Sequence, residues 1–371
     1  MADFGADVIK VEHPRGDDMR SMGWADQGVS LWWALISRNK RCVTLKLSDP
    51  QGQELFKKLT ADADVLIENF RPGTLERWGI GPDVLHEVNP GLVIVRTTGF
   101  GQTGPYSNQP GYGTLAESMS GFAELNGWPD KPPSLPPFAL ADGVAGLTGT
   151  YAAMFALWWR DHGGRGKGQV VDLAIYEPLF WLLGPQASLY DRLGMVQKRT
   201  GNSAPFVSPR NAYQANDGRW LGLSASSQSI AERVMKIVGR EDLVQEEWFR
   251  DHRGRLEHND ELDAIIGAWI AERDSAEVLE TFAAGEAAIA LMYTIEDIVE
   301  DPQYLERESV VRVEHPVLGD LLMQGVIPRL VDTPGSVQYP GAELGEHNAE
   351  IYGGLGLSPA QVDRLCGDGV L

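Results

Sequence analysis

The chain contains 371 residues, of which 32 are Lys or Arg and 52 are Asp or Glu, so its net charge is −20. This acidity argues against general binding of nucleic acid or of an anionic membrane, and we expect neither as a partner. The two cysteines, Cys42 and Cys366, lie far apart, which excludes a disulfide framework and is typical of the cytoplasm, where we expect the protein. No uninterrupted apolar run approaches the ~20 residues that a membrane-spanning helix needs.

Short β-branched runs in the first half of the chain predict strands, at residues 7–11, 63–67, 92–97 and 169–175. Helical patterns lie between them, at residues 51–59, 73–78, 82–87 and 140–159. Strands that alternate with helices form βαβ units, so we expect a large α/β domain built on a parallel sheet.

The second half of the chain has a different character. Residues 182–208 are rich in loop residues, and hairpins are predicted at 213–225, around Asp217–Gly218, and at 310–325. Helical patterns lie at 230–238, 260–271 and 276–284, within an acidic stretch that we read as a solvated face. We therefore predict a large domain over 1–190, a linker over 191–214, a small acidic domain over 215–300, and a second linker with a return to the large domain over 301–371.

Several familiar catalytic motifs are absent from the sequence. It has no GxxxxGK[ST] phosphate loop, no GxSxG, no HExxH and no paired Cys/His ligands, so we expect no metal site. The absence of GxGxxG argues against a nicotinamide dehydrogenase. The pairs Trp32–Trp33 and Trp158–Trp159 lie in apolar helical patterns, which favours core packing over a sugar-binding cleft.

Asp142 lies at an apparent helix start, in ALADGVAGLTG (139–149), after a segment rich in glycine. Its carboxylate has two interpretations. It caps the helix by accepting backbone N–H bonds, or it is an exposed, ionised carboxylate that acts as a nucleophile without needing a base. Spacing alone favours the cap. For Gly146 and Gly149, close helix packing and close approach to a ligand remain equal alternatives.

Basic residues follow a predicted strand directly in NFRPGTLERWG (69–79). Open α/β sheets bind ligands at the carboxyl ends of their strands. Arg71 and Arg77 could therefore grip phosphate groups, although surface solubility is the simpler explanation for two such arginines.

Taken together, these segments resemble one family, the class III coenzyme A transferases, which include formyl-CoA and carnitine-CoA transferases and the α-methylacyl-CoA racemases. The resemblance spans nearly the whole chain, in family order, and is carried most specifically by ADVLIENFRPGTLERWGI (63–80) and ALADGVAGLTG (139–149). It implies a Rossmann-like large domain with a parallel sheet, a smaller α+β domain, and two chains interlocked as a homodimer.

The resemblance also implies an activity: acyl-CoA:carboxylate CoA transfer through an aspartyl mixed anhydride and an aspartyl-CoA thioester. The substrates would be an acyl-CoA and a carboxylic acid, with no permanently bound cofactor. By position, Asp142 matches the catalytic aspartate, with an oxyanion held by backbone N–H groups near Gly143. The other residues carried over are the active-site lining Tyr112, Gly113 and Gly143, and the CoA-binding Leu45, Lys46, Asn69, Phe70, Arg71 and Arg77.

Two departures from the family pattern bear on this expectation. The racemase branch has His-Asp where this chain has Tyr112–Gly113, which favours transfer over racemisation because racemisation needs an acid/base pair. An acyl-CoA racemase or intramolecular CoA transferase, and a non-catalytic acyl-CoA-binding protein, are the alternatives.

Family members also begin with one further strand and helix, so we expect the encoded protein to be longer than 371 residues.

Overall fold

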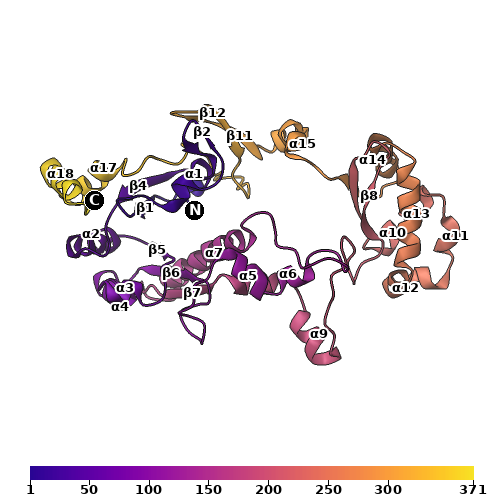
Figure 1. The fold of residues 1–371 in the computed structure, drawn as a ribbon, viewed down its shortest axis with the longest axis horizontal. Coiled ribbons are helices and arrows are strands. Elements are labelled where there is room, and N and C mark those ends of the chain that lie inside the picture. The colour runs from indigo at the N-terminus through magenta and orange to yellow at the C-terminus, as the bar shows by residue number, and fades with distance from the viewer. The chain divides into compact units, whose positions relative to one another are not determined.

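The computed structural model describes residues 1–371, and its internal contacts divide the chain into two compact units. The first unit comprises Met1–Ala116, Ala139–Leu179 and Val299–Leu371, and the second comprises Glu117–Phe138 and Phe180–Ile298 (Figure 1). The acidic, helix-rich stretch of the sequence lies mainly in the second unit.

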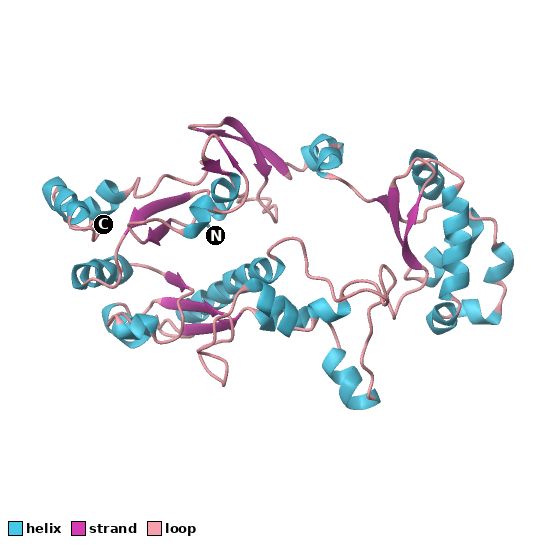
Figure 2. Cartoon of the chain, in the orientation of Figure 1, coloured by secondary structure: helices cyan, strands magenta, loops and turns pink.

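The parallel strands of the first unit form two sheets. One pairs β1 (Val8–Glu12) with β4 (Lys40–Thr44), and the other places β6 (Val93–Thr98) between β5 (Val65–Glu68) and β7 (Val170–Ala174) (Figure 2). All pairings are parallel, as the alternation of strands and helices predicted. The single sheet that we expected is divided because β1 and β5 do not pair with each other.

Helices cover the two faces of the β5–β6–β7 sheet differently. On one face, α2 (Pro50–Ala61), α3 (Thr74–Arg77) and α4 (Pro82–Val88) share a large apolar core with the C-terminal helices α17 (Asn348–Gly354) and α18 (Pro359–Gly367). The long helix α7 (Leu140–His162) packs on β6 and β7 on the other face (Figure 1).

Small residues let α7 approach the sheet closely. Ala153 and Ala156 are buried against Val93 and Val95 of β6. A Cβ on Gly149 would lie 3.6 Å from Val95, whereas one on Gly146 would meet nothing within 4 Å. Gly149 thus faces the sheet at a distance where a Cβ would make ordinary contact, whereas Gly146 faces open space, so close packing requires glycine at neither position.

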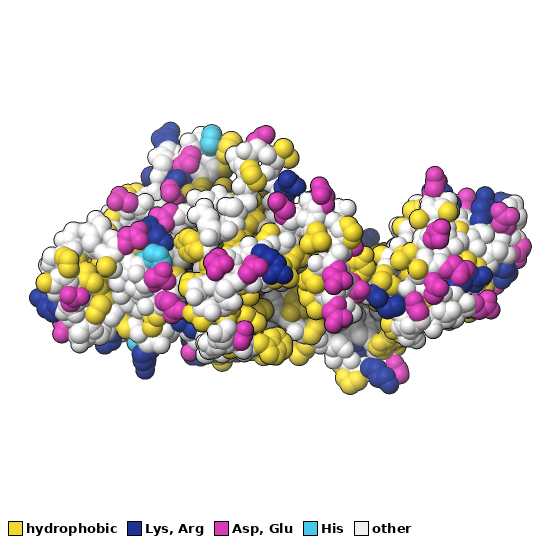
Figure 3. All heavy atoms as spheres, turned by 90° about the horizontal axis from the view of Figure 1, so that it is seen from above, with side chains coloured by type: hydrophobic (Ala, Val, Ile, Leu, Met, Phe, Trp, Pro, Cys, Tyr) yellow, Lys and Arg dark blue, Asp and Glu magenta, His cyan; other side chains and the backbone are white.

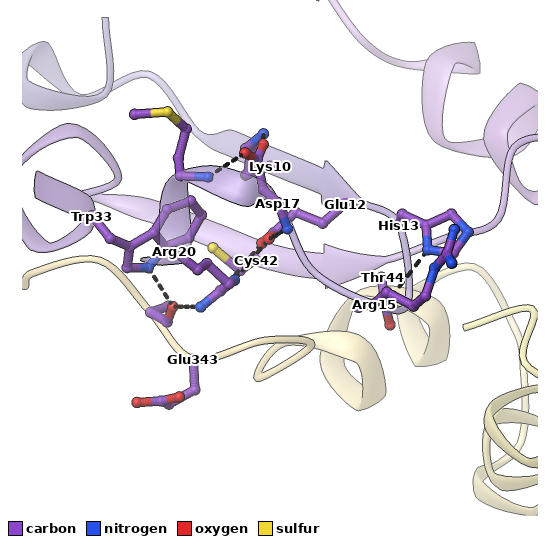
Figure 4. A network of polar contacts seen from close by, with 12 residues as sticks. Lys10, Glu12, His13, Arg15, Asp17, Arg20, Trp33, Cys42, Thr44 and Glu343 are labelled. Carbon is purple, nitrogen blue, oxygen red and sulfur yellow. Dashed lines mark hydrogen bonds and ion pairs between the residues drawn. The ribbon is translucent and has the colours of Figure 1, made fainter. Parts of the chain in front are cut away.

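A buried ion pair connects β1 to the neighbouring loop and to the C-terminal segment of the first unit. Nε and Nη2 of Arg20 each donate to Glu12 at 2.8 Å, and the Glu12 side chain is fully buried. The guanidinium stacks 4.0 Å above the ring of Trp33, and both residues donate to the carbonyl of Ala342 at 3.1 Å (Figure 4). This network fixes the carboxyl end of β1.

The other elements of the first unit are short. They comprise 3₁₀ turns at Ala2–Phe4 and Asp18–Ser21, β2 (Ala25–Asp26), β3 (Val29–Ser30), α1 (Leu31–Ile36), α16 (Pro302–Glu306), and the predicted hairpin of β11 (Val310–His315) and β12 (Gly319–Gln324). Three helices run across the boundaries between the units: α5 (Gly113–Met119), α8 (Tyr176–Leu182) and α15 (Ile295–Glu300).

The second unit is an antiparallel sheet with a helical layer around its own core. Its strands are β8 (Arg210–Gln214), β9 (Trp220–Ser224) and β10 (Ile289–Leu291), and the β8–β9 hairpin turns at Asp217–Gly218 as predicted. Its helices are α6 (Phe122–Leu125), α9 (Gln186–Leu193), α10 (Gln228–Ile237), α11 (Glu241–Val244), a 3₁₀ turn (Glu247–Arg250), α12 (His252–Glu257), α13 (Asn259–Ala271) and α14 (Ser275–Ala284). Helix α9 lies inside the stretch that we predicted to be loop.

Apolar side chains reach the surface in several places (Figure 3), including the side of α7 that faces away from the sheet. Trp158 and Trp159 are 66% and 46% exposed, so our prediction of core packing was wrong for this pair, although Trp33 is buried. By length and composition α7 could cross a membrane, but apolar helices that pack on sheets pass the same test. The search of the sequence for apolar runs did not detect α7, because glycine and threonine residues interrupt its apolar run.

The Glu12–Arg20 pair makes a prediction for stability. Arg20→Met should lower the free energy of unfolding of the first unit by about 3 kcal/mol, because it leaves a buried carboxylate without its partner. Arg41→Met is the matched control, since Arg41 pairs with the exposed Asp7 and Glu350, and it should cost less than about 1 kcal/mol. Urea unfolding of both variants measures the difference, and equal losses would contradict the prediction.

Candidate active site

Asp142 is the third residue of α7, and the helix begins too early for it to be the cap. The N-cap residue is Ala139, which makes no side-chain capping bond, so our preferred capping interpretation was wrong. The Asp142 side chain is exposed to solvent. It lies in the first turn, where the helix dipole stabilises negative charge. The remaining interpretation, an accessible carboxylate, fits this position.

The Asp142 carboxylate lies next to the backbone of Gly113, the first residue of α5. A Cβ built on Gly113 would lie 2.2 Å from Oδ2 and 2.9 Å from Cγ of Asp142, far inside van der Waals contact. The exposed Tyr112 precedes it, and the Tyr112 carbonyl accepts bonds from Leu115 and Ala116 at 3.0 and 3.1 Å. The structure thus brings Gly113 and Asp142 together, and only glycine leaves room for the carboxylate as it stands.

A second pair of glycines brings the segment that precedes Gly113 into contact with the end of β6. Gly99 directly follows β6, and a Cβ on Gly99 would lie 2.4 Å from Cα of Gly111. The two backbones therefore cross in contact. Because Gly113 lies two residues beyond Gly111, the Asp142 carboxylate is held near the carboxyl end of β6, where open α/β sheets bind ligands.

Burial raises the pKa of the Asp142 carboxyl above its ordinary value, although the side chain reaches solvent. Desolvation by the surrounding backbone disfavours the charged form. The same effect makes the carboxylate more basic than a free aspartate, a property that suits a nucleophile.

The N–H group of Gly143 itself is bonded within the helix, so an oxyanion would need other backbone N–H groups nearby. The Gly143 N–H donates to the carbonyl of Ala139 at 3.0 Å, within the first turn of α7. A Cβ on Gly143 would meet nothing within 4 Å, so this glycine lies at an open surface next to Asp142.

The segment after β5 exposes three of the expected CoA-binding side chains. Asn69, Phe70 and Arg71 follow the last residue of β5, Glu68, and all three are exposed. The Phe70 ring contacts Trp78 edge-on at 5.2 Å, which turns the segment back toward α3. Gly73 has a φ of 78°, a left-handed conformation that starts α3 directly after the turn.

Arg77 ends α3 with its guanidinium exposed. Its Nη2 donates to the hydroxyl of Thr74 at 2.8 Å, which orients the side chain without pairing its charge. The structure therefore leaves Arg71 and Arg77 at the surface of one short segment at the end of β5.

Leu45 and Lys46 lie just beyond β4 and differ in accessibility. Leu45 is 2% exposed and packs in the apolar core, so its side chain does not reach a ligand here. Lys46 is partly exposed, and its N–H donates to the carbonyl of Val370 at 2.7 Å. Two shallow hollows of the first unit, of about 250 and 230 Å³, are lined by neither of these residues nor by Asp142.

Sequence reasoning missed Arg96 of β6, whose side chain binds both ends of the segment that follows β5. It is 5% exposed and forms ion pairs with Glu68 and Glu76 at 2.6 and 2.7 Å. The signal was available, because an arginine in the middle of the apolar run LVIVRT requires a buried partner.

Comparison with known proteins identifies the family of the chain. The model of CoA-transferase family III matches residues 1–348. This chain belongs to CoA-transferase family III. It is therefore a class III CoA-transferase, an enzyme whose substrates are CoA thioesters.

Similar proteins extend over almost the entire chain. The succinyl-CoA–D-citramalate CoA-transferase of Chloroflexus aurantiacus is 40% identical over 95% of this chain and 88% of that protein. The beta subunit of the succinyl-CoA–L-malate CoA-transferase of the same organism is 39% identical over 98% of this chain and 91% of that protein. A CAIB/BAIF family protein from Brucella suis shares the fold with a TM-score of 0.81, at 30% identity over 95% and 93% of the two chains.

The contact between Gly113 and Asp142 predicts the effect of one added methyl group. Gly113→Ala should push the carboxylate into another rotamer and lower kcat by about 100-fold, the scale expected for a misplacement of about 1 Å. Gly146→Ala is the control. Gly146 lies in the same helix as Asp142, and a Cβ added there would meet nothing within 4 Å. Steady-state kinetics of both variants test this, and full activity of Gly113→Ala would contradict it.

The raised pKa of Asp142 predicts an acid limb in the pH profile. If Asp142 is the nucleophile, protonation makes it unreactive, so kcat/KM for the CoA thioester should fall as pH decreases through the pKa of Asp142. Because burial raises that pKa, the fall should begin at a higher pH than for an ordinary aspartate of pKa about 3.9. A profile that stays flat down to pH 4 in a protein that remains folded would refute this.

Proposed function

We propose that this enzyme transfers coenzyme A from succinyl-CoA to a small hydroxy-dicarboxylic acid, with Asp142 as the covalent nucleophile. The observation that carries the proposal is the exposed Asp142 carboxylate, held against the backbone of Gly113 near the carboxyl end of β6. The choice of substrates follows the names of the two relatives from Chloroflexus aurantiacus, which act on citramalate and malate.

The first half of the reaction moves CoA onto the enzyme. A carboxylate oxygen of Asp142 attacks the thioester carbonyl and expels CoA thiolate, which leaves a succinyl-aspartyl anhydride. The thiolate then attacks the aspartyl carbonyl and releases succinate, which leaves an aspartyl-CoA thioester. Each step exchanges one activated acyl bond for another, so no ATP is needed.

The second half of the reaction repeats these steps with the acceptor. The acceptor carboxylate attacks the aspartyl-CoA thioester and expels CoA thiolate, forming a second anhydride. The thiolate attacks the acceptor carbonyl of that anhydride, which releases the new CoA thioester and restores the Asp142 carboxylate. Exclusion of water from the anhydrides favours transfer over hydrolysis.

In this proposal, the segment after β5 binds coenzyme A. Arg71 and Arg77 present charged side chains for the phosphates. Phe70 offers an exposed ring next to them, and Asn69 an exposed amide. Lys46 and the backbone of Leu45 are the further contacts that we propose.

The contact between Gly113 and Asp142 supports transfer over racemisation. Gly113 has no side chain to move a proton, and Asp142 occupies the space that an acid or base there would need, which disfavours racemisation.

The exposed apolar face of α7, with Leu147, Tyr151 and Phe155, supports a homodimer in which a second copy covers it. We also propose that the enzyme is cytoplasmic.

Trapping the covalent intermediate tests the proposed chemistry. Hydroxylamine added during turnover with succinyl-CoA should convert Asp142 to a hydroxamate that peptide mass spectrometry detects. Asp142→Asn should abolish both the adduct and transfer, whereas Asp161→Asn, on the exposed end of the same helix, should retain both. Thioester binding without any adduct would instead indicate a non-catalytic binding protein.

A separate measurement decides between transfer and racemisation. Incubation of a 2-methylacyl-CoA in deuterated water should leave the α-proton unexchanged, because transfer never breaks that bond. Rapid deuterium incorporation would favour a racemase.

A further inference from the structure

The buried cation Arg96 connects both ends of the proposed CoA-binding segment. It lies in the centre of β6, directly opposite Glu68 of β5 in the parallel register. Its Nε donates to Glu68 at 2.6 Å, and its Nη1 and Nη2 donate to the two oxygens of Glu76 at 2.7 and 3.3 Å. The side chains of Arg96 and Glu68 are 7% and 3% exposed, and that of Glu76 is 44% exposed.

Each of the two glutamates immediately precedes residues that are proposed to contact coenzyme A. Glu68 comes immediately before Asn69, and Glu76 immediately before Arg77. The second oxygen of Glu68 also accepts the N–H of Phe70 at 2.7 Å, so one carboxylate joins the buried arginine to the exposed loop. A single guanidinium therefore sets the distance between the start and the end of the segment.

The electrostatics of the cluster are consistent with its geometry. Burial raises the pKa of Glu68, and the ion pair with Arg96 opposes that rise. Partial burial acts in the same direction on Glu76, but there the hydrogen bonds from Arg96 win and lower the pKa. Without Arg96, two carboxylates would face each other beneath the segment, and their repulsion would push its ends apart.

We propose that Arg96 is a positioning residue for coenzyme A, which acts by holding Glu68 and Glu76 so that Phe70, Arg71 and Arg77 face one ligand. This inference rests on the proposed function, because it assumes that these exposed residues bind the CoA nucleotide. It assigns Arg96 no contact with substrate and no part in the chemistry at Asp142.

The test separates positioning from general stability by using partly exposed Glu76. Glu76→Gln should weaken binding of free coenzyme A by about tenfold in isothermal titration, since one ion pair to Arg96 is lost while the fold keeps its core. The KM for succinyl-CoA should rise by the same factor, with kcat and the KM for the acceptor acid changed less than about twofold. Arg96→Lys should shift the same parameters in the same direction, because lysine cannot reach both carboxylates with a planar fork.

Arg38 supplies the matched control. Its side chain is 10% exposed, pairs with Asp3 at 2.8 Å and also donates to the backbone carbonyl of Gly325, but it touches no part of residues 68–77. Arg38→Lys should leave the affinity for coenzyme A unchanged. Wild-type affinity in Glu76→Gln, or an equal loss in Arg38→Lys, would overturn the assignment of Arg96.

The wild-type titration distinguishes failure of this inference from failure of the proposed function. If the wild-type protein binds no coenzyme A, both fall together. If it binds coenzyme A and forms the Asp142 hydroxamate but Glu76→Gln binds equally well, only the role of Arg96 is refuted.

Discussion

The missing side chain at Gly113 is the constraint on which the candidate site depends. Asp142 can present its carboxylate in the observed position because the backbone opposite it carries no Cβ, which would lie 2.2 Å from Oδ2. The same vacancy bears on the proposed chemistry, since a residue without a side chain cannot take or give a proton at a substrate carbon. One glycine thus makes room for the Asp142 carboxylate and provides no acid or base of its own.

Strand β6 organises every part of the site around that contact. Its middle residue, Arg96, holds the segment that carries Arg71 and Arg77, and the residue after its end, Gly99, crosses Gly111 and so positions Gly113. Helix α7, which bears Asp142, packs on the same strand through Ala153, Ala156 and Gly149. Asp142, the Gly113 backbone and the segment proposed to bind coenzyme A are therefore all positioned by one buried strand, which gives them a common rigid support.

Local pattern predicted the elements well, and non-local geometry accounts for what it missed. The four predicted strands and the helix at Asp142 were visible because β-branched runs and apolar spacing are local signals. The cap at Asp142 was wrong because α7 starts at Leu140 with Ala139 as its N-cap, and a shift of three residues turns a cap into a first-turn residue. The close approach of Gly113, the division of the sheet and the pairing of Arg96 each depend on contacts between distant segments, which spacing does not encode. Family resemblance supplied Asp142 and Arg77, but it gave no indication of Arg96.

Local charge explains how a protein with a net charge of −20 can present a site for an anionic ligand. Glu76 is the neighbour of Arg77 in sequence, but adjacent residues of a helix do not face each other. Here Arg96 binds both Glu68 and Glu76 from below, and Arg77 donates to the neutral hydroxyl of Thr74 instead. The buried arginine therefore occupies the two carboxylates nearest to the ligand segment. The charged side chains of Arg71 and Arg77 remain exposed. An anionic ligand that approaches them is affected mainly by these two charges, because salt screens charges farther away than about 10 Å.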